Sequence, residues 1–253
     1  LLDQGHVAVH GSVDHNGDIP GALAGLMDDL QREFGAEAFS SCGVTGSVEL
    51  RGGAMVDPIL AAVEANRFFD TGCSNILSIG CESFCLILLN EKGEYLEHAV
   101  NPMCASGTGS FLDQQAERIG LKTGELAERA FAYAGRTPGI ATRCAVFAKS
   151  DIIHAQADGY SKDAIGAGLC EGMTRSVVAG LVRGRTLGPG VVFTGGVSAN
   201  RKVAMELSEQ LGAEVRILEH SQVFDAVGAA LLGQATGCNP DDLAGSMREN
   251  RDT

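Results

Sequence analysis

The chain has 253 residues, of which 45% are hydrophobic and 5% aromatic, and its formal net charge is −13. This length suffices for one large or two small domains. The acidic balance argues against nucleic-acid and anionic-membrane partners, because both need basic patches. No apolar run approaches the roughly 20 residues of a membrane-spanning helix, and we find no secretory signal peptide. We therefore expect a protein with no nucleic-acid and no membrane partner.

Cysteine usage indicates the compartment. Eight cysteines in a chain without a recognisable signal favour a reducing cytoplasm over a disulfide framework. No two of them form a Cys-x-x-Cys pair. Each cysteine is therefore expected to be free, buried or a ligand, in a cytoplasmic protein.

The first part of the chain alternates between strand and helix signals. Residues 1–5 have the pattern of a strand end, and residues 6–12 that of a returning strand. Asp18 is a suitable cap for an amphipathic helix over 18–34. A strand over 39–45 and a helix over 55–69 follow. This order predicts an α/β unit with parallel strands.

The remaining elements form a second set that begins near residue 75. Strands are expected over 76–79, 84–89, 95–100, 191–193 and 215–218. Helices are expected over 108–119, 124–133, 145–157, from 162 onward, 201–211 and 223–234, with Thr123 as a cap. In the long helix that follows Ser161, apolar residues at steps of four are expected to share one face: Ile165, Leu169, Met173, Val177 and Leu181. The composition places the boundary between 70 and 74. We expect a first lobe over 1–72, a second over 73–238, and a loose polar tail over 239–253.

Two cysteines stand directly before predicted helices. Cys104 lies in NPMCASGTG (101–109) and Cys144 lies in ATRCAVFAK (141–149). Helix N-termini carry unpaired N–H groups and a partial positive charge, which lower a thiol pKa and favour an anionic centre. Gly107 and Gly109 allow the backbone to come close to such a centre. A thiolate-bound iron–sulfur cluster is one such anionic centre, so the pattern is compatible with a cluster site.

The number of ligands points to a dimer. Cys104 and Cys144 cannot complete a shell of four thiolates, but a twofold dimer doubles them. The alternative is that both cysteines are small buried hydrophobic residues, as unpaired cysteines commonly are. Spacing alone leaves both interpretations open.

Longer motifs around these cysteines carry a resemblance to a known family. Asn101–Asp113 fits Asn-x-x-Cys-Ala-x-Gly-Thr-Gly-x-Phe-Leu-Asp, and Cys144–Ser150 fits Cys-x-Val-Phe-Ala-x-Ser. Thr194–Val197 supplies Thr-Gly-Gly-Val, and Asp225–Ala230 resembles Gly-Ala-x-Gly-Ala-Ala. The chain thus resembles the activators of 2-hydroxyacyl-CoA dehydratases and the ATP-binding subunits of benzoyl-CoA reductases, over nearly its whole length to about Gly233.

This resemblance implies a fold, cofactors and partners. The fold would be the two-lobed actin-like fold of the acetate and sugar kinase, heat-shock-70 and actin superfamily. The protein would be a homodimer sharing one [4Fe–4S] cluster on Cys104 and Cys144. ATP with Mg²⁺ would drive transfer of one low-potential electron to a CoA-ester dehydratase or reductase in an anaerobic cell. The implied nucleotide-binding residues are Gly80, Gly107, Thr108, Gly109, Gly195 and Gly196.

Two departures from the family pattern concern phosphate binding. The family's first strand and first Gly-rich phosphate loop have no match in these residues, so the fold is expected to lack its first strand. The second loop, Asp-Ile-Gly-Gly-Gln/Glu-Asp-x-Lys in the family, is SIGCESFC over 78–85. Ser78 and Ser83 therefore replace carboxylates that would hold Mg²⁺. Glu82 remains as the candidate catalytic residue that positions water; otherwise it is a plain loop glutamate. We expect poor ATP hydrolysis.

Three functions remain open at this point. The first is an ATP-coupled electron-transfer activase. The second is a cluster-binding electron carrier or scaffold that no longer hydrolyses ATP, which the altered loop favours. The third is a sugar-kinase-like phosphotransferase, which has no need of the two cysteine motifs.

Overall fold

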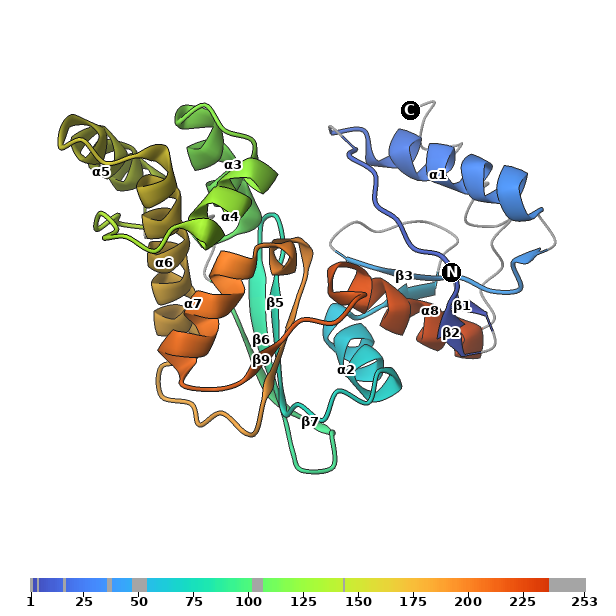
Figure 1. Ribbon diagram of the computed structural model, residues 1–253. Helices are drawn as coiled ribbons and strands as arrows, with labels where there is room; N and C mark the ends of the chain where they lie inside the picture. The colour runs from blue at the N-terminus through green and yellow to red at the C-terminus, as the bar shows by residue number, and fades with distance from the viewer. Residues whose placement is uncertain are drawn as a thin grey trace. The chain divides into compact units, whose positions relative to one another are not determined.

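The computed structural model describes residues 2–3, 5–15, 17–35, 38–46, 54–101, 107–142 and 144–236 (Figure 1). The chain divides into two compact units, Leu1–Asp70 with Val223–Thr253, and Thr71–Gln222. The expected boundary near residue 72 lies close to this division. The expected second lobe over 73–238 differs from it, because the last helix belongs to the first unit. The expected tail over 239–253 lies outside the described residues.

In its described residues, the first unit combines two small sheets with three α-helices. Its elements are β1 (Leu2–Asp3), β2 (His6–Val7), α1 (Ile19–Phe34), β3 (Gly43–Thr45), β4 (Ala54–Val56), α2 (Pro58–Phe68) and α8 (Phe224–Thr236). β3 and β4 pair in parallel, although β4 was not expected as a strand. The expected strand over 6–12 is wrong as a parallel neighbour of β3, since β2 pairs antiparallel with β1 in a separate sheet. The Asp18 side chain accepts from the Gly21 N–H and caps α1. The expected helix over 55–69 begins later, because Asp57 caps α2 and Pro58 opens it.

Glycines let α8 pack closely within this unit. A Cβ built on Gly43 of β3 would lie 1.8 Å from the Ala229 carbonyl oxygen, and one on Gly228 would lie 1.8 Å from the Ala61 carbonyl oxygen. Neither position can carry a larger side chain without moving the helix. These approaches explain why α8 joins the first unit although it follows the second in sequence.

The second unit is built on a five-stranded sheet of order β7-β6-β5-β8-β9. The strands are β5 (Asn75–Ile79), β6 (Phe84–Leu89), β7 (Tyr95–Val100), β8 (Val191–Thr194) and β9 (Val215–Arg216). β5, β6 and β7 pair antiparallel, whereas β5, β8 and β9 pair in parallel. The parallel pairing places the carboxyl ends of β5 and β8 at the same edge of the sheet.

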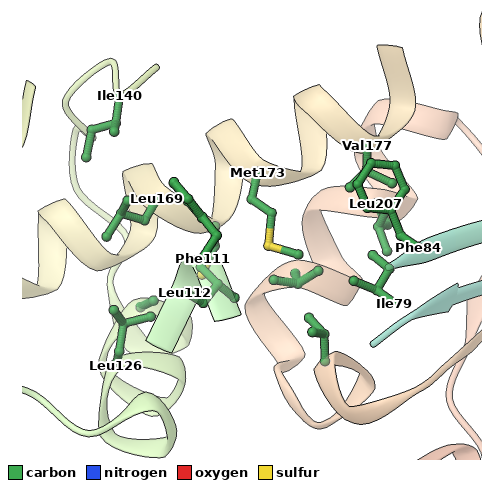
Figure 2. Close-up of a cluster of buried hydrophobic side chains, with 14 of the residues drawn as sticks. Ile79, Phe84, Phe111, Leu112, Leu126, Ile140, Leu169, Met173, Val177 and Leu207 are labelled. Carbon is green, nitrogen blue, oxygen red and sulfur yellow. The ribbon is translucent and has the colours of Figure 1, made fainter. Parts of the chain in front are cut away.

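Helices of the second unit enclose a core against one face of this sheet. They are α3 (Gly109–Arg118), α4 (Thr123–Ala132), α5 (Ala145–Ala157), α6 (Lys162–Leu181) and α7 (Arg201–Leu211), with the 3-10 helices η2 (Gly196–Ala199) and η3 (Ser221–Val223) near the end of the unit. The predicted inward stripe of α6 is confirmed, since Ile165, Leu169, Met173, Val177 and Leu181 are at most 1% exposed. Figure 2 shows three residues of this stripe, Leu169, Met173 and Val177, in one cluster with Phe111, Leu112, Ile79 and Phe84. Each such side chain contributes about 1.5–3 kcal/mol by burial.

Among the described residues, no helix combines the length and the apolar character needed to cross a membrane.

Candidate functional site

Two glycine turns meet at the carboxyl edge of the β5–β8 pair. Ser78 and Thr194 are the last paired residues, and Gly80 and Gly195 follow the two strands. Gly195 has φ +84, and a Cβ there would lie 2.5 Å from the Ile79 carbonyl oxygen. Only glycine tolerates both conditions. The two turns are therefore in direct contact.

The start of α3 is attached to the first of these turns. The Gly109 N–H donates to the Gly80 carbonyl at 2.8 Å, and the Ser110 N–H donates to the Cys81 carbonyl at 2.8 Å. Thr108 is the N-cap residue and is fully buried. The backbone of 80–81 thus closes the first turn of α3, which brings the 78–83 loop and the 107–109 turn together as the motifs predict.

A cavity of about 560 Å³ opens beside these turns, entirely within the second unit. Its wall includes residues of the 80–81 turn, α3, α4, η2 and the start of α7. The lining residues are Gly80, Cys81, Gly109, Leu112, Asp113, Thr123, Gly124, Ala127, Glu128, Phe131, Gly196, Val197, Ala199, Asn200 and Arg201. A cavity of this size accommodates a small-molecule ligand.

The predicted nucleotide-binding residues divide into two groups. Gly80, Gly109 and Gly196 line the cavity. Gly107, Thr108 and Gly195 lie beside those three in the chain and do not line it. Glu82 is exposed, follows Cys81 and is also absent from the lining.

The polar groups of the cavity wall are held by specific contacts. The Thr123 hydroxyl donates to Asp113 Oδ1 at 2.6 Å. The Arg201 guanidinium lies over the Phe131 ring, 4.2 Å from its centroid. Three charged side chains, Asp113, Glu128 and Arg201, are present in the described wall. Partial burial, followed by the charges of Asp113 and Glu82, raises the pKa of the Cys81 thiol.

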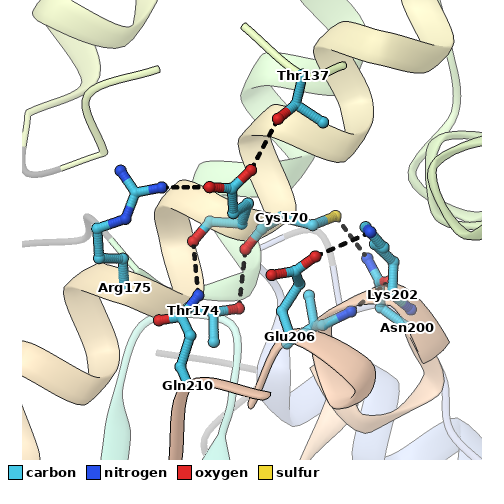
Figure 3. Close-up of polar contacts among 10 residues, drawn as sticks. Thr137, Cys170, Thr174, Arg175, Asn200, Lys202, Glu206 and Gln210 are labelled. Carbon is cyan, nitrogen blue, oxygen red and sulfur yellow. Dashed lines mark hydrogen bonds and ion pairs between the residues drawn. The ribbon is translucent and has the colours of Figure 1, made fainter. Parts of the chain in front are cut away.

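Asn200 connects the cavity to the buried interior. Its Oδ1 accepts from the N–H groups of Lys202 and Val203, which caps α7. Its Nδ2 donates to Cys170 Sγ at 3.5 Å (Figure 3). Burial raises the pKa of the Cys170 thiol to about 12. These three hydrogen bonds hold the Asn200 side chain, and with it the start of α7 at Arg201, in place at the cavity wall.

Sequence reasoning missed most of the α4 contribution. Gly124, Ala127, Glu128 and Phe131 all line the cavity, at a spacing that places them on one helix face. The sequence alone suggests that residues 125–129 form a solvated helix face; Glu128 and Arg129 are exposed, as this predicts, but the interpretation is wrong for Leu126, which is fully buried. The expected capping role of Thr123 is also wrong, since Lys122 is the N-cap and Thr123 bonds Asp113 instead. The helical spacing was a signal that could have identified this face.

Of the two candidate cluster ligands, Cys144 lies within the described residues. Cys144 is half-exposed, is the N-cap residue of α5, and makes no side-chain capping hydrogen bond among the described residues. Its thiol therefore stands at the N-terminus of α5. Cys104 lies outside the described residues. Within the described part of the chain, no group of three or more His, Cys, Asp or Glu side chains could hold a metal ion.

Known proteins resemble this chain in sequence and in fold. It is 31% identical to the protein YjiL of Escherichia coli K12 over 66% of this chain and 65% of that one. It is 36% identical to the (R)-2-hydroxyglutaryl-CoA dehydratase activating ATPase of Acidaminococcus fermentans over 56% of this chain and 54% of that one. Each match thus spans less than two thirds of the relative's length.

The fold comparison agrees with the sequence comparison. The structure of the activator of the 2-hydroxyisocaproyl-CoA dehydratase from Clostridium difficile with bound ADPNP superimposes with a TM-score of 0.74 at 22% identity, covering 91% of this chain and 84% of that one. The fold expected from the resemblance to these activators is therefore confirmed. The sequence model of the BadF/BadG/BcrA/BcrD ATPase family matches residues 64–233. The chain belongs to the BadF/BadG/BcrA/BcrD ATPase family.

Proposed function

We propose that this protein is a homodimeric activator that uses ATP to pass one low-potential electron from a shared [4Fe–4S] cluster to a CoA-ester dehydratase or reductase. The observation that carries the proposal is the cavity at the 80–81 and 195–196 turns, in the same unit as Cys144. The Acidaminococcus relative, named as a dehydratase-activating ATPase, supports the activator role and the type of partner.

The cavity suits an adenine nucleotide in shape and chemistry. Phe131 and Arg201 offer a planar, polarisable wall for a purine base. Carboxylates of Asp113 and Glu128 can accept hydrogen bonds from ribose hydroxyls. Phosphates would then lie toward Gly80 and the start of α3, where the helix dipole favours negative charge. The N–H groups of Gly109 and Ser110 would not contact them, because they already donate to the Gly80 and Cys81 carbonyls. In this assignment Gly107, Thr108 and Gly195 shape the turns, and Gly196 contacts the nucleoside.

ATP hydrolysis is expected to be slow. Phosphoryl transfer needs a metal that neutralises developing charge and a group that orients the attacking water. Ser78 and Ser83 offer no carboxylate for Mg²⁺, and Glu82, the candidate for orienting water, is exposed. The chain would therefore hold nucleotide better than it cleaves it.

The cluster assignment rests on Cys144 and Cys104 from each of two subunits. The Cys144 thiol fits such a group because it is half-exposed and stands at the start of α5. Val146 and Phe147 in the first turn of α5, and Ile153 two turns later, are exposed apolar side chains, as a subunit contact would require. The bound cluster would supply one-electron transfer, and helix N–H groups would stabilise its negative charge.

The altered loop favours a second candidate, a cluster-binding carrier without ATP hydrolysis. Anaerobic production followed by iron, sulfide and Mg-ATP turnover measurements on one sample distinguishes the possibilities. A cluster with turnover supports the activase, and a cluster without turnover supports the carrier. Turnover without iron would contradict both and would indicate a phosphotransferase.

A further inference from the structure

The segment that leads to Cys144 lies along α6 at very short distances. A Cβ built on Gly168 would lie 2.6 Å from the Pro138 carbonyl oxygen. A Cβ on Gly172, one helical turn later, would lie 2.7 Å from the Ile140 carbonyl oxygen and 2.8 Å from Thr142 Cγ2. Such distances are shorter than real Cβ contacts, so this segment can approach α6 only because both positions are glycine.

Hydrogen bonds fix the same segment in register on α6. The Thr142 hydroxyl donates to the Gly172 carbonyl, and Thr142 Oγ1 lies 2.7 Å from Ser176 Oγ. A hydroxyl carries one hydrogen, so Ser176 is the donor in the second bond. The Thr137 hydroxyl donates to Glu171 at 2.8 Å (Figure 3). Thr142 is 3% exposed, so its bonds are protected from water.

The neighbouring residue of the same helical turn faces the other cysteine motif. Val177 Cγ2 lies 3.3 Å from the position of a Cβ on Gly107, which has φ +97. Gly107 belongs to the CASGTG stretch that contains Cys104, and Thr142 precedes Cys144 by two residues. One turn of α6 therefore contacts both cysteine-bearing motifs.

We infer that the α6 turn from Gly172 to Val177 positions Cys144 as a cluster ligand and joins it mechanically to the 107–109 turn at the nucleotide cavity. Gly172, Ser176 and Thr142 are positioning residues in this account, and none of them binds the cluster or the nucleotide. The inference rests on the proposed function for the ligand role of Cys144. The contacts themselves exist whether or not a cluster is present.

The test compares two variants that loosen this attachment with one that does not. Gly172→Ala introduces a methyl group where the Ile140 carbonyl lies. Thr142→Val keeps the shape and removes both hydroxyl bonds, so it provides an answer if Gly172→Ala fails to fold. Gly180→Ala is the matched control on the same helix, because the nearest atom to its Cβ, Phe84 Cε2, is 4.0 Å away.

Two rates measure how firmly Cys144 is held in place. In cluster-free protein, the rate of iodoacetamide alkylation at Cys144 is followed by peptide mass spectrometry, with and without ADP, relative to the exposed Cys81 in the nucleotide-free sample. In iron-loaded protein, the rate of iron loss to a chelator is measured anaerobically. Thr142→Val loses both hydrogen bonds of the Thr142 hydroxyl, and Gly172→Ala displaces the 140–142 segment by its added methyl group. Both rates should therefore rise about tenfold in each variant. ADP should change the Cys144 rate in the parent protein and not in Thr142→Val.

The outcomes separate this inference from the proposed function. If both variants fold and their rates stay within about twofold of Gly180→Ala, the turn does not position Cys144. If ADP leaves the Cys144 rate of the parent unchanged, the connection to the cavity is wrong. If the parent protein takes up no iron, the proposed function fails, while the alkylation rates still decide whether α6 holds Cys144.

Discussion

Arg201 lies over the ring of Phe131, with 4.2 Å between the guanidinium carbon and the ring centroid. The two residues come from α7 and α4, and both line the cavity at the glycine turns. This pair joins the α4 and α7 sides of the cavity wall. It therefore provides the most direct way to test where a nucleotide base lies.

Removing either member should weaken nucleotide binding. Because base stacking and cation–π contacts are each worth about 1–2 kcal/mol, Phe131→Ala and Arg201→Ala should each raise the Kd for ADP about five- to thirtyfold. Titration calorimetry measures this change. Arg32→Ala on α1, which removes an exposed Arg32–Asp29 pair, is the control. Unchanged affinity in both cavity variants would place the base elsewhere.

Cys81 should report occupancy of the cavity. The pKa of its thiol is raised, so its alkylation rate should climb about tenfold per pH unit from pH 7 to 9 without a plateau. Bound ADP should slow the reaction, because Cys81 lines the cavity. Cys170 is the internal control, since burial raises the pKa of its thiol to about 12 and it should stay unmodified. Equal Cys81 rates with and without saturating ADP would contradict the proposed site.

Hydrolysis should be limited by the missing carboxylates of the second phosphate loop. Losing the metal ligands should cost several kcal/mol in the transition state, so turnover of Mg-ATP should be roughly a thousandfold below that of a typical enzyme. Ser78→Asp restores one carboxylate and should raise turnover at least about tenfold, whereas Ser150→Asp on α5 should not. Ordinary turnover by the parent protein would show that the loop needs no carboxylate.

Stability should depend on pH through Asp225 of α8. Its Oδ1 is buried without a hydrogen-bond partner among the described residues, and burial raises its pKa to about 6. A raised pKa means that the folded state holds the proton more tightly than the unfolded chain. The protonated Asp225 side chain therefore contributes its full stabilisation of the folded state below about pH 4. This contribution is lost as the pH rises through about 6.

Asp225→Asn removes this titration. Urea unfolding measures the free energy of unfolding of both proteins. Between pH 4 and pH 7 this free energy should rise in the variant, relative to the parent protein, by up to about 3 kcal/mol, and the difference should stay constant above pH 7. Asp14→Asn, at an exposed position, should show no such trend. A parent protein whose stability rises over this interval relative to Asp225→Asn would contradict the assignment.

The close packing of α8 against α2 leads to a further prediction about stability. Gly228→Ala should destabilise the protein by about 3 kcal/mol, because its Cβ would lie 1.8 Å from the Ala61 carbonyl oxygen and α8 would have to move from α2. Gly25→Ala in α1 has no neighbour within 4 Å and should instead stabilise by about 1 kcal/mol through helix propensity. Denaturant unfolding of both variants measures the contrast, and equal effects would refute it.

The fold could be predicted where local periodicity and packing agree. The stripe on α6 and the strands β5 to β7 were predicted nearly to the residue, because burial on one face leaves a clear repeat. The membership of α8 in the first unit was not predicted. It depends on contacts of Gly43 and Gly228 with distant backbone, and sequence periodicity carries no signal for such contacts.

The sequence motifs led to glycines at the backbone turns of this cavity, but not to the side chains that form most of its wall. The glycine motifs led to Gly80, Gly109 and Gly196, because close backbone approach requires glycine. Phe131 and Arg201 meet only after α4 and α7 have packed, so their pairing has no local pattern. The packing of residues 137–142 against α6 could not be predicted either. Glycines in a long helix allow close packing, but the sequence does not indicate which segment packs there.

The central claim is that two subunits share one cluster through Cys104 and Cys144. Its most direct measurement is the iron content of anaerobically prepared protein, together with its mass in solution. The account predicts a dimer with about four iron atoms, lost in Cys104→Ser and in Cys144→Ser but retained in Cys42→Ser. A colourless monomer that binds ADP normally, or a dimer whose iron survives Cys144→Ser, would contradict it.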